Sequence, residues 1–180
     1  MRVIAGTARG VRLSRVPPGT RPLSDRAREG LFSSLGDRVQ GARCADLFAG
    51  TGAIGIEALS RGAASCLFVD AAPAAIRAVR ENLERTGLTD RATVVRAEAR
   101  AALARHPGPF DLAFLDPPYA FPADGLGDLL THLAEVVASG GTVALTRPKG
   151  NRTDVIPVHW LLARTLSYGD TRILVLQEAA

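Results

Sequence analysis

The sequence contains few cysteines, few aromatic residues and a single lysine. With only Cys44 and Cys66, a secreted scaffold held by disulfides is excluded, and a reducing, cytoplasmic setting is expected. No apolar run approaches the ~20 residues that a membrane span needs, so we expect no membrane association. The beginning of the chain lacks the apolar stretch of a signal peptide. The three histidines show no metal-ligand spacing, so no metal is expected.

What the chain does contain fits one folded domain. Hydrophobic residues make up 47% of it and charged residues 22%, which is too apolar a composition for a disordered chain. A length of 180 residues suffices for one domain that buries a core of its own.

Positive charge is concentrated at the beginning of the chain. Residues 1–43 contain nine arginines and three acids, a net charge of +6, whereas residues 44–180 contain thirteen bases and fifteen acids, a net charge of −2. A GC-rich genome would account for arginine over lysine, but not for the scarcity of acids in one segment. We therefore expect this segment to bind a polyanion, and the alternative is that the arginines only keep a basic protein soluble. The candidates for phosphate contacts are Arg9, Arg12, Arg15 and Arg21.

The first 22 residues are expected to form a small arm. Two short apolar pieces, Val3–Ile4 and Val11–Leu13, flank a glycine-containing turn and predict a β-hairpin. A proline-rich connection follows, and Ser24 can then cap a helix whose apolar residues recur at helical spacing. We expect residues 1–22 to be a basic hairpin arm and residues 23–180 to be the main domain.

From residue 43 onward, short β-rich segments alternate with helical ones. This alternation predicts an α/β fold with a doubly wound, mostly parallel sheet covered on both faces. Two last strands, joined only by Gly169 and Asp170, have no room for a helix and must form an antiparallel hairpin, which brings the sheet to seven strands. The predicted strands are 44–48, 66–70, 92–96, 110–116, 142–146, 160–168 and 171–177, and the predicted helices are roughly 53–61, 72–86, 98–105 and 123–137.

A glycine-rich loop follows the first predicted strand. Its sequence GTGAIG matches the G-x-G-x-x-G pattern of dinucleotide sites, and Asp70 comes twenty residues after Gly50. Asp46 argues against a dinucleotide, because a carboxylate at the end of a buried strand needs a cation or several donors. The ammonium group of S-adenosylmethionine meets that need, and Asp70 suits the ribose hydroxyls of either cofactor. After the third strand, Glu98 suits either the adenine amino group or the amino-terminal end of the next helix.

The most informative segment is Asp116-Pro117-Pro118-Tyr119, directly after the fourth predicted strand. In a sheet of this type the fourth strand neighbours the first, so this loop faces the glycine loop. Asp116 and the carbonyl of Pro117 can each accept one N–H of a nucleobase amine and orient it, while the prolines fix the backbone. Tyr119 offers a flat face on which a flipped-out base can stack.

Together these residues resemble the class I, S-adenosylmethionine-dependent amino-methyltransferases of nucleic acids, whose fold is Rossmann-like. The segments RVIAGTARGVRL and GTRPLSDRAREGLFSSL are similar to the opening of the RsmD-type enzymes, which methylate the 2-amino group of one guanine in 16S ribosomal RNA. The resemblance implies S-adenosylmethionine as cofactor and the small ribosomal subunit or its 16S rRNA as partner, and we expect a monomer. Leu23 departs from the family, where threonine is expected. The implied cofactor contacts are Asp46, Phe48, Gly50, Thr51, Gly52, Asp70 and Glu98, and the implied target-base contacts are Asp116, Pro117, Pro118 and Tyr119.

Other functions stay open at this stage. A DNA or RNA adenine amino-methyltransferase would use the same DPPY loop, although the DNA enzymes usually carry an added recognition domain for which this length leaves no room. An NAD-linked oxidoreductase is disfavoured by Asp46 and by the lack of a proton-handling residue in the site. A non-catalytic RNA-binding module would not require both loops.

Overall fold

The computed structural model describes residues 1–15, 21–150 and 156–179, and it confirms the predicted alternation of strands and helices. The helices are α1 (Asp25–Leu35), α2 (Ala53–Ser60), α3 (Pro73–Thr86), α4 (Ala99–Arg105) and α5 (Ala123–Val136), with short 3-10 turns at Gly36–Val39 and Thr89–Arg91. The strands are β1 (Arg43–Asp46), β2 (Ser65–Asp70), β3 (Ala92–Arg96), β4 (Phe110–Leu115), β5 (Val137–Pro148), β6 (Trp160–Tyr168) and β7 (Thr171–Glu178).

The seven strands form one sheet in the order β3-β2-β1-β4-β5-β7-β6. The first five strands are parallel, and β7 pairs antiparallel with both β5 and β6, so the expected terminal hairpin is confirmed. Strand order reverses between β1 and β4, which places the loops after these two strands side by side at the carboxyl edge of the sheet.

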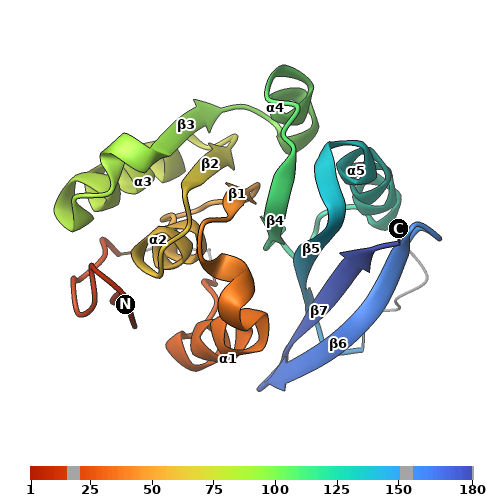
Figure 1. Cartoon of the computed structure of the whole chain (residues 1–180), viewed down its shortest axis with the longest axis horizontal. Coiled ribbons are helices and arrows are strands. Elements are labelled where there is room, and N and C mark those ends of the chain that lie inside the picture. The colour runs from red at the N-terminus through yellow and green to blue at the C-terminus, as the bar shows by residue number, and fades with distance from the viewer. Residues whose placement is uncertain (16–20, 151–155, 180) are drawn as a thin grey trace.

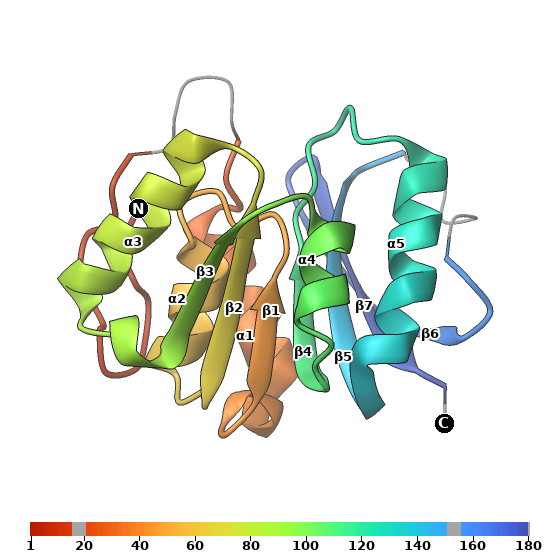
Figure 2. The ribbon, with the colours of Figure 1, turned by 90° about the horizontal axis from the view of Figure 1, so that it is seen from above.

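Helices cover both faces of this sheet (Figure 1). One hydrophobic cluster joins the sheet to α1, α2, α3 and the amino-terminal segment, and a second joins it to α4 and α5. Figure 2 shows the amino-terminal segment beside α2 and α3. The predicted cap is present, since the Ala27 N–H donates to the Ser24 hydroxyl over 3.1 Å. Leu23, the departure from the family pattern, is buried in the first cluster.

The fifth strand is longer than predicted. We expected it at 142–146, but β5 begins at Val137, immediately after the last residue of α5. Its first residue pairs with Phe110, and a register shift then brings Thr142 opposite Leu112. No glycine or proline marks the junction between α5 and β5, so the sequence contains no signal for this boundary.

The amino-terminal hairpin is present but minimal. A single bridge joins Arg2 to Arg12, and the Val3 and Gly10 N–H groups donate to Val11 and Val3 carbonyls over 3.0 and 2.9 Å. Each limb has only two or three apolar residues, which is too few for a longer ladder. The proline-rich connection at residues 16–20 lies outside the described residues.

The amino-terminal segment is also part of the hydrophobic core. Val3, Ala8 and Leu13 are buried in the first cluster. On α2, the buried carboxylate of Glu57 accepts the N–H groups of Ile4 and Ala5 over 2.9 and 3.0 Å. Residues 1–15 thus pack against the main domain. The division into an arm (residues 1–22) and a main domain (residues 23–180) therefore remains a proposal about function.

Two smaller expectations concern the core and its helices. Cys44 and Cys66 are free, buried and in register on β1 and β2, as small core residues. Within the described ranges, none of the helices combines the length and apolar character that crossing a membrane requires.

Candidate active site

The glycine loop connects β1 to α2 with two residues that only glycine suits. Gly50 and Gly52 have φ angles of 56° and 81°, in the left-handed region that other residues rarely adopt. A Cβ on Gly52 would also lie 3.3 Å from the side chains of Ile56 and Val79. The buried Thr51 between them is fixed through its carbonyl, which accepts the Asn82 amide over 2.8 Å.

Asp46 lies at the end of β1, beneath this loop, with only 1% of its surface exposed. Its Oδ2 atom accepts the Gly55 N–H over 3.0 Å, whereas its Oδ1 atom has no hydrogen-bond partner among the described residues. Burial raises the pKa of Asp46 to about 7, and the nearby Asp116 and Asp70 carboxylates add to this rise. The structure thus holds a buried carboxylate with one oxygen free to accept a donor.

Asp70 is the last residue of β2, and its side chain connects the glycine loop to this strand through a hydrogen bond. Its Oδ2 atom accepts the Gly50 N–H and its Oδ1 atom accepts the Ala72 N–H, each over 2.9 Å. The side chain is half-buried, and each oxygen retains a lone pair for a further donor. Glu98 is the N-cap residue of α4, but its exposed side chain makes no capping hydrogen bond. Both interpretations of Glu98, an adenine contact and a helix-terminal charge, therefore stay open.

The DPPY loop begins where β4 ends. Asp116 is half-buried and follows Leu115, and β4 lies beside β1 with Phe114 opposite Asp46. Burial raises the pKa of Asp116 to about 6, against the opposing effect of a hydrogen bond with the Thr146 side chain. Pro117 is buried, whereas the Tyr119 side chain is 49% exposed and free to contact a ligand.

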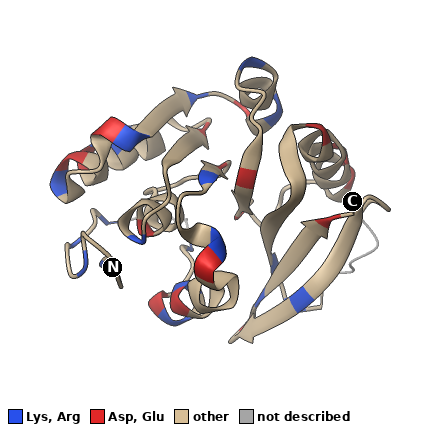
Figure 3. Ribbon diagram, viewed as in Figure 1, with Lys and Arg blue, Asp and Glu red and all other residues tan. Residues whose placement is uncertain are grey.

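The predicted RNA-contact arginines, Arg9, Arg12, Arg15 and Arg21, are all exposed. Figure 3 shows basic residues and no acidic ones along the first fifteen residues, whereas α5 carries acids and no lysine or arginine. Arg21 lies 3.9 Å from Asp170 in the turn between β6 and β7. The structure thus brings the three aspartates of the site together and leaves the four arginines on the surface.

A family model described as "Conserved hypothetical protein 95" matches residues 1–177. The chain belongs to this family. It is 34% identical over 185 aligned residues to ribosomal RNA small subunit methyltransferase D of Escherichia coli K12, covering 100% of this chain and 91% of that protein. A Bacillus subtilis relative, provisionally named an rRNA methyltransferase, is 46% identical over 123 residues, which are 66% of this chain and 67% of the relative. The predicted resemblance to the RsmD-type methyltransferases is confirmed.

Solved structures agree with this family assignment. An Escherichia coli protein provisionally named as the methyltransferase yhhF superposes with a TM-score of 0.85 at 32% identity, over 100% of this chain and 98% of that one. A Thermus thermophilus protein of unassigned function superposes with a TM-score of 0.82 at 34% identity, over 97% of this chain and 98% of that one. The predicted Rossmann-like fold of class I methyltransferases is thereby confirmed.

Two residues that contact the candidate site were not identified from the sequence. The Phe121 ring, just after the DPPY segment, packs edge-on against Phe48, with ring centroids 5.2 Å apart. Thr146, near the end of β5, reaches Asp116 from the neighbouring strand. A signal for Thr146 did exist, because the end of the fifth strand must lie beside the end of the fourth. In the part of the chain that the structure describes, no group of three or more His, Cys, Asp or Glu residues could hold a metal.

Proposed function

We propose that this protein transfers a methyl group from S-adenosylmethionine to the exocyclic 2-amino group of a guanine in 16S ribosomal RNA. The observation that carries the proposal is the buried Asp46 carboxylate between a glycine loop and a DPPY loop, one oxygen of which has no hydrogen-bond partner among the residues that the structure describes. Membership in the family of ribosomal RNA small subunit methyltransferase D supports the choice of substrate.

The residues present suit the cofactor. The unpartnered Oδ1 atom of Asp46 can accept an ammonium N–H, which would compensate the cost of burying the carboxylate. The Asp70 carboxylate suits a vicinal diol, and Gly50, Thr51 and Gly52 allow a ligand to approach the backbone closely. Phe48 and Glu98 complete the proposed set from the adjacent loops. S-adenosylmethionine supplies an electrophilic methyl group when bound.

The DPPY loop acts on the nucleophile. An exocyclic amine is a poor nucleophile while its lone pair is delocalised into the ring. Asp116 and the carbonyl of Pro117 each accept one N–H. The amine is thereby held in an orientation in which its nitrogen lone pair is less delocalised into the ring and can attack the methyl group. Pro118 fixes the backbone, and Tyr119 supports the flipped base by stacking. Formation of the N–C bond would be accompanied by cleavage of the bond between the methyl carbon and the cofactor sulfur, with S-adenosylhomocysteine as the leaving group. The amine loses one proton, either to Asp116 or to solvent.

Substrate binding relies on the basic amino-terminal segment. The exposed Arg9, Arg12, Arg15 and Arg21 are proposed to contact phosphates of the RNA. In this proposal residues 1–22 serve as an RNA-binding arm and residues 23–180 as the methyltransferase domain. The protein acts as a cytoplasmic monomer on the small ribosomal subunit.

One experiment tests the reaction and its target together. The protein is incubated with labelled S-adenosylmethionine and with small ribosomal subunits that lack the modification, and the nucleosides are analysed by mass spectrometry. N2-methylguanosine in 16S rRNA is the expected product. N6-methyladenosine would favour the adenine amino-methyltransferase alternative, and an absence of labelled nucleoside would contradict the proposal.

A further inference from the structure

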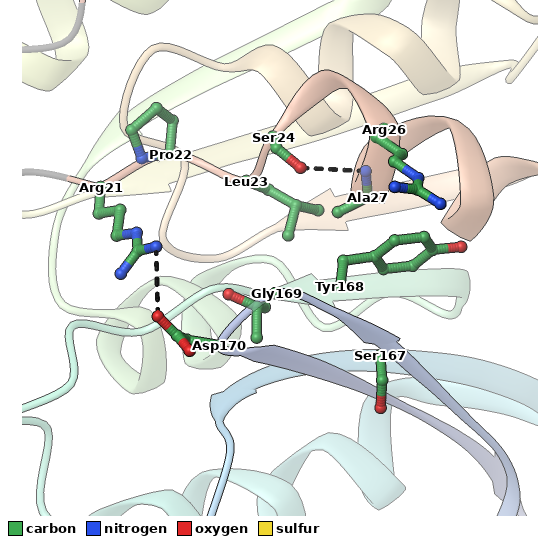
Figure 4. Close-up of a pocket in the computed structure, with 11 residues that line it drawn as sticks. Arg21, Pro22, Leu23, Ser24, Arg26, Ala27, Ser167, Tyr168, Gly169 and Asp170 are labelled. Carbon is green, nitrogen blue, oxygen red and sulfur yellow. Dashed lines mark hydrogen bonds and ion pairs between the residues drawn. The ribbon is translucent and has the colours of Figure 1, made fainter.

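A pocket lies at the same edge of the sheet as the DPPY loop. It encloses about 310 Å³ between the beginning of α1 and the β6–β7 turn. Arg21 and Arg26 line it from one side, and Tyr168 and Asp170 from the other (Figure 4). Thr171 also lines the pocket. Arg26 and Tyr168 have no part in the proposed methyl transfer, so this pocket is an additional site.

The sheet register places this pocket near the proposed catalytic residues. Thr171 pairs with Pro148 and Ile173 pairs with Thr146, whose side chain contacts Asp116. Strand spacing and rise per residue therefore place Thr171 roughly 10–15 Å from Asp116. The turn is fixed to β5 because the Lys149 N–H donates to the Asp170 carbonyl over 2.8 Å. A short stretch of single-stranded RNA spans such a distance.

The ion pair at the pocket, between Arg21 and Asp170, is weak enough for a phosphate to replace Asp170. Arg21 and Asp170 face each other at 3.9 Å, with 67% and 82% of their side chains exposed. An ion pair this long and this exposed contributes little to stability, so a phosphate can displace Asp170 from Arg21 at small cost. A guanidinium can bind a phosphate through two parallel hydrogen bonds. The contact between Arg21 and Asp170 is a single one at 3.9 Å, so a phosphate would bind Arg21 more strongly than Asp170 does. Arg26 is also exposed and supplies a second cation.

The pocket also has an aromatic wall in a fixed position. The half-buried Tyr168 packs against the first hydrophobic cluster. A Cβ on Gly30 of α1 would lie only 1.6 Å from the Tyr168 hydroxyl oxygen, so the close approach of α1 to this ring requires glycine. An aromatic ring beside arginines is typical of sites for single-stranded nucleic acid, where bases or sugars stack and phosphates pair.

We infer that this pocket binds a nucleotide that flanks the target guanine in the RNA strand. Its phosphate pairs with Arg21 and Arg26, and its base or sugar lies on the Tyr168 ring. This inference rests on the proposed function, because it assigns a second contact to the same RNA substrate. With Tyr119 holding the target base, the two contacts would fix the direction of the strand through the site.

The test compares two double variants that remove the same charge. R21A/R26A removes both cations of the pocket, whereas the control R80A/R105A removes exposed arginines from α3 and α4. Affinity for unmodified small ribosomal subunits is measured across a salt series. We expect R21A/R26A to raise Kd about tenfold or more and to lower the salt slope by about one, and the control to change Kd less than threefold. Equal effects of the two double variants would overturn the inference.

The aromatic wall is tested separately. Y168F retains the ring and should bind subunits like the unmodified protein, whereas Y168L should bind them about tenfold more weakly because it cannot stack. Calorimetry with S-adenosylmethionine and thermal unfolding show whether each variant retains its fold. If the unmodified protein methylates no rRNA, the proposed function fails, and the difference in subunit affinity between the double variants still decides whether the pocket binds RNA.

Discussion

The Arg28 guanidinium and the Glu57 carboxylate are both fully buried, and their Nε and Oε2 atoms lie 3.7 Å apart. Arg28 also donates to the Arg2 carbonyl over 2.6 Å, while Glu57 accepts Arg61 Nε over 2.8 Å. Because Glu57 accepts two N–H groups of the amino-terminal segment as well, this ion pair joins α1, α2 and the proposed arm.

Glu57→Gln should therefore destabilise the whole fold. The substitution leaves the buried Arg28 without one of its carboxylate partners, and breaking a buried pair costs about 3–5 kcal/mol. Thermal unfolding should show a fall in Tm of roughly 10 °C. The matched control is Glu81→Gln, which removes an exposed pair with Arg85 on α3 and should change Tm by about a degree or two. Similar Tm values for the two variants would contradict the role given to Glu57.

Asp46→Asn should stabilise the protein without cofactor and weaken cofactor binding. The pKa of Asp46 is raised to about 7, so ionisation is unfavourable in the folded state, and its contribution to stability falls as pH rises from about 4 to 7. Asparagine can still accept the Gly55 N–H but does not ionise. At about pH 8 we expect a higher Tm than that of the unmodified protein, and a smaller difference at about pH 5.

Calorimetry at the same alkaline pH completes this test of Asp46. Asparagine cannot pair with an ammonium group, so S-adenosylmethionine should bind at least about tenfold more weakly. The control Asp90→Asn removes an exposed charge and should leave both Tm and affinity unchanged. Normal affinity in Asp46→Asn would show that Asp46 does not hold the ammonium group.

Phe121→Ala should slow methylation more than it weakens cofactor binding. The ring packs edge-on against Phe48 at 5.2 Å and so joins the loop after β4 to the loop after β1. Without it, Asp116 and Tyr119 are held less firmly, and we expect kcat to fall about tenfold with the cofactor Kd within about threefold. Phe121→Leu fills most of the same space and should recover part of the rate. A change in Kd alone would assign Phe121 to cofactor binding instead.

The fold and much of the site were predictable because both follow from local patterns. The alternation of β-rich and helical segments located the first four strands and the later part of the fifth. The order of strands in a doubly wound sheet then placed Asp46 and Asp116 at one edge. Gly50 and Gly52 were predictable for the same reason, since a tight turn between strand and helix needs left-handed residues.

What the sequence did not predict depends on contacts between distant residues. Glu57 is a charged residue on a helix, and such residues usually face solvent, yet here the amino-terminal segment covers it. The start of β5 was missed because pairing with β4, rather than a local turn signal, decides it. Phe121 was missed because its partner Phe48 is remote in the chain.

The arginines of the amino-terminal segment should govern RNA affinity without affecting the chemistry. Deleting the segment would expose the hydrophobic cluster around Val3, so point substitutions are needed. Arg9→Ala and Arg12→Ala, combined, should raise the Kd for small subunits and lower the salt slope by about one for each phosphate that these arginines neutralise. The modified nucleoside and kcat at saturating substrate should not change. An unaltered salt slope would mean that these arginines only keep the protein soluble.

The methylation rate should fall at acid pH through protonation of Asp116. Its pKa is raised to about 6, so below that pH the carboxylate gains a proton and loses its full capacity to accept from the amine. We expect kcat to fall about tenfold per pH unit below this pKa. Thr146→Val removes the hydrogen bond that lowers this pKa, so the fall should begin at a higher pH. An unshifted profile in Thr146→Val would assign the titration to another group.

Two substitutions at Asp116 complete this test and separate its possible roles. Asp116→Ala should abolish methylation and leave the cofactor Kd within a few-fold, because the residue acts on the nucleophile. Asp116→Asn keeps one acceptor oxygen, so it should retain measurable activity if Asp116 only orients the amine, and this activity should no longer fall at acid pH. If Asp116 must receive the proton, asparagine should be as inactive as alanine. Undiminished methylation by Asp116→Ala would refute the assignment of the DPPY loop, since the proposed reaction requires an acceptor for the amine at this position.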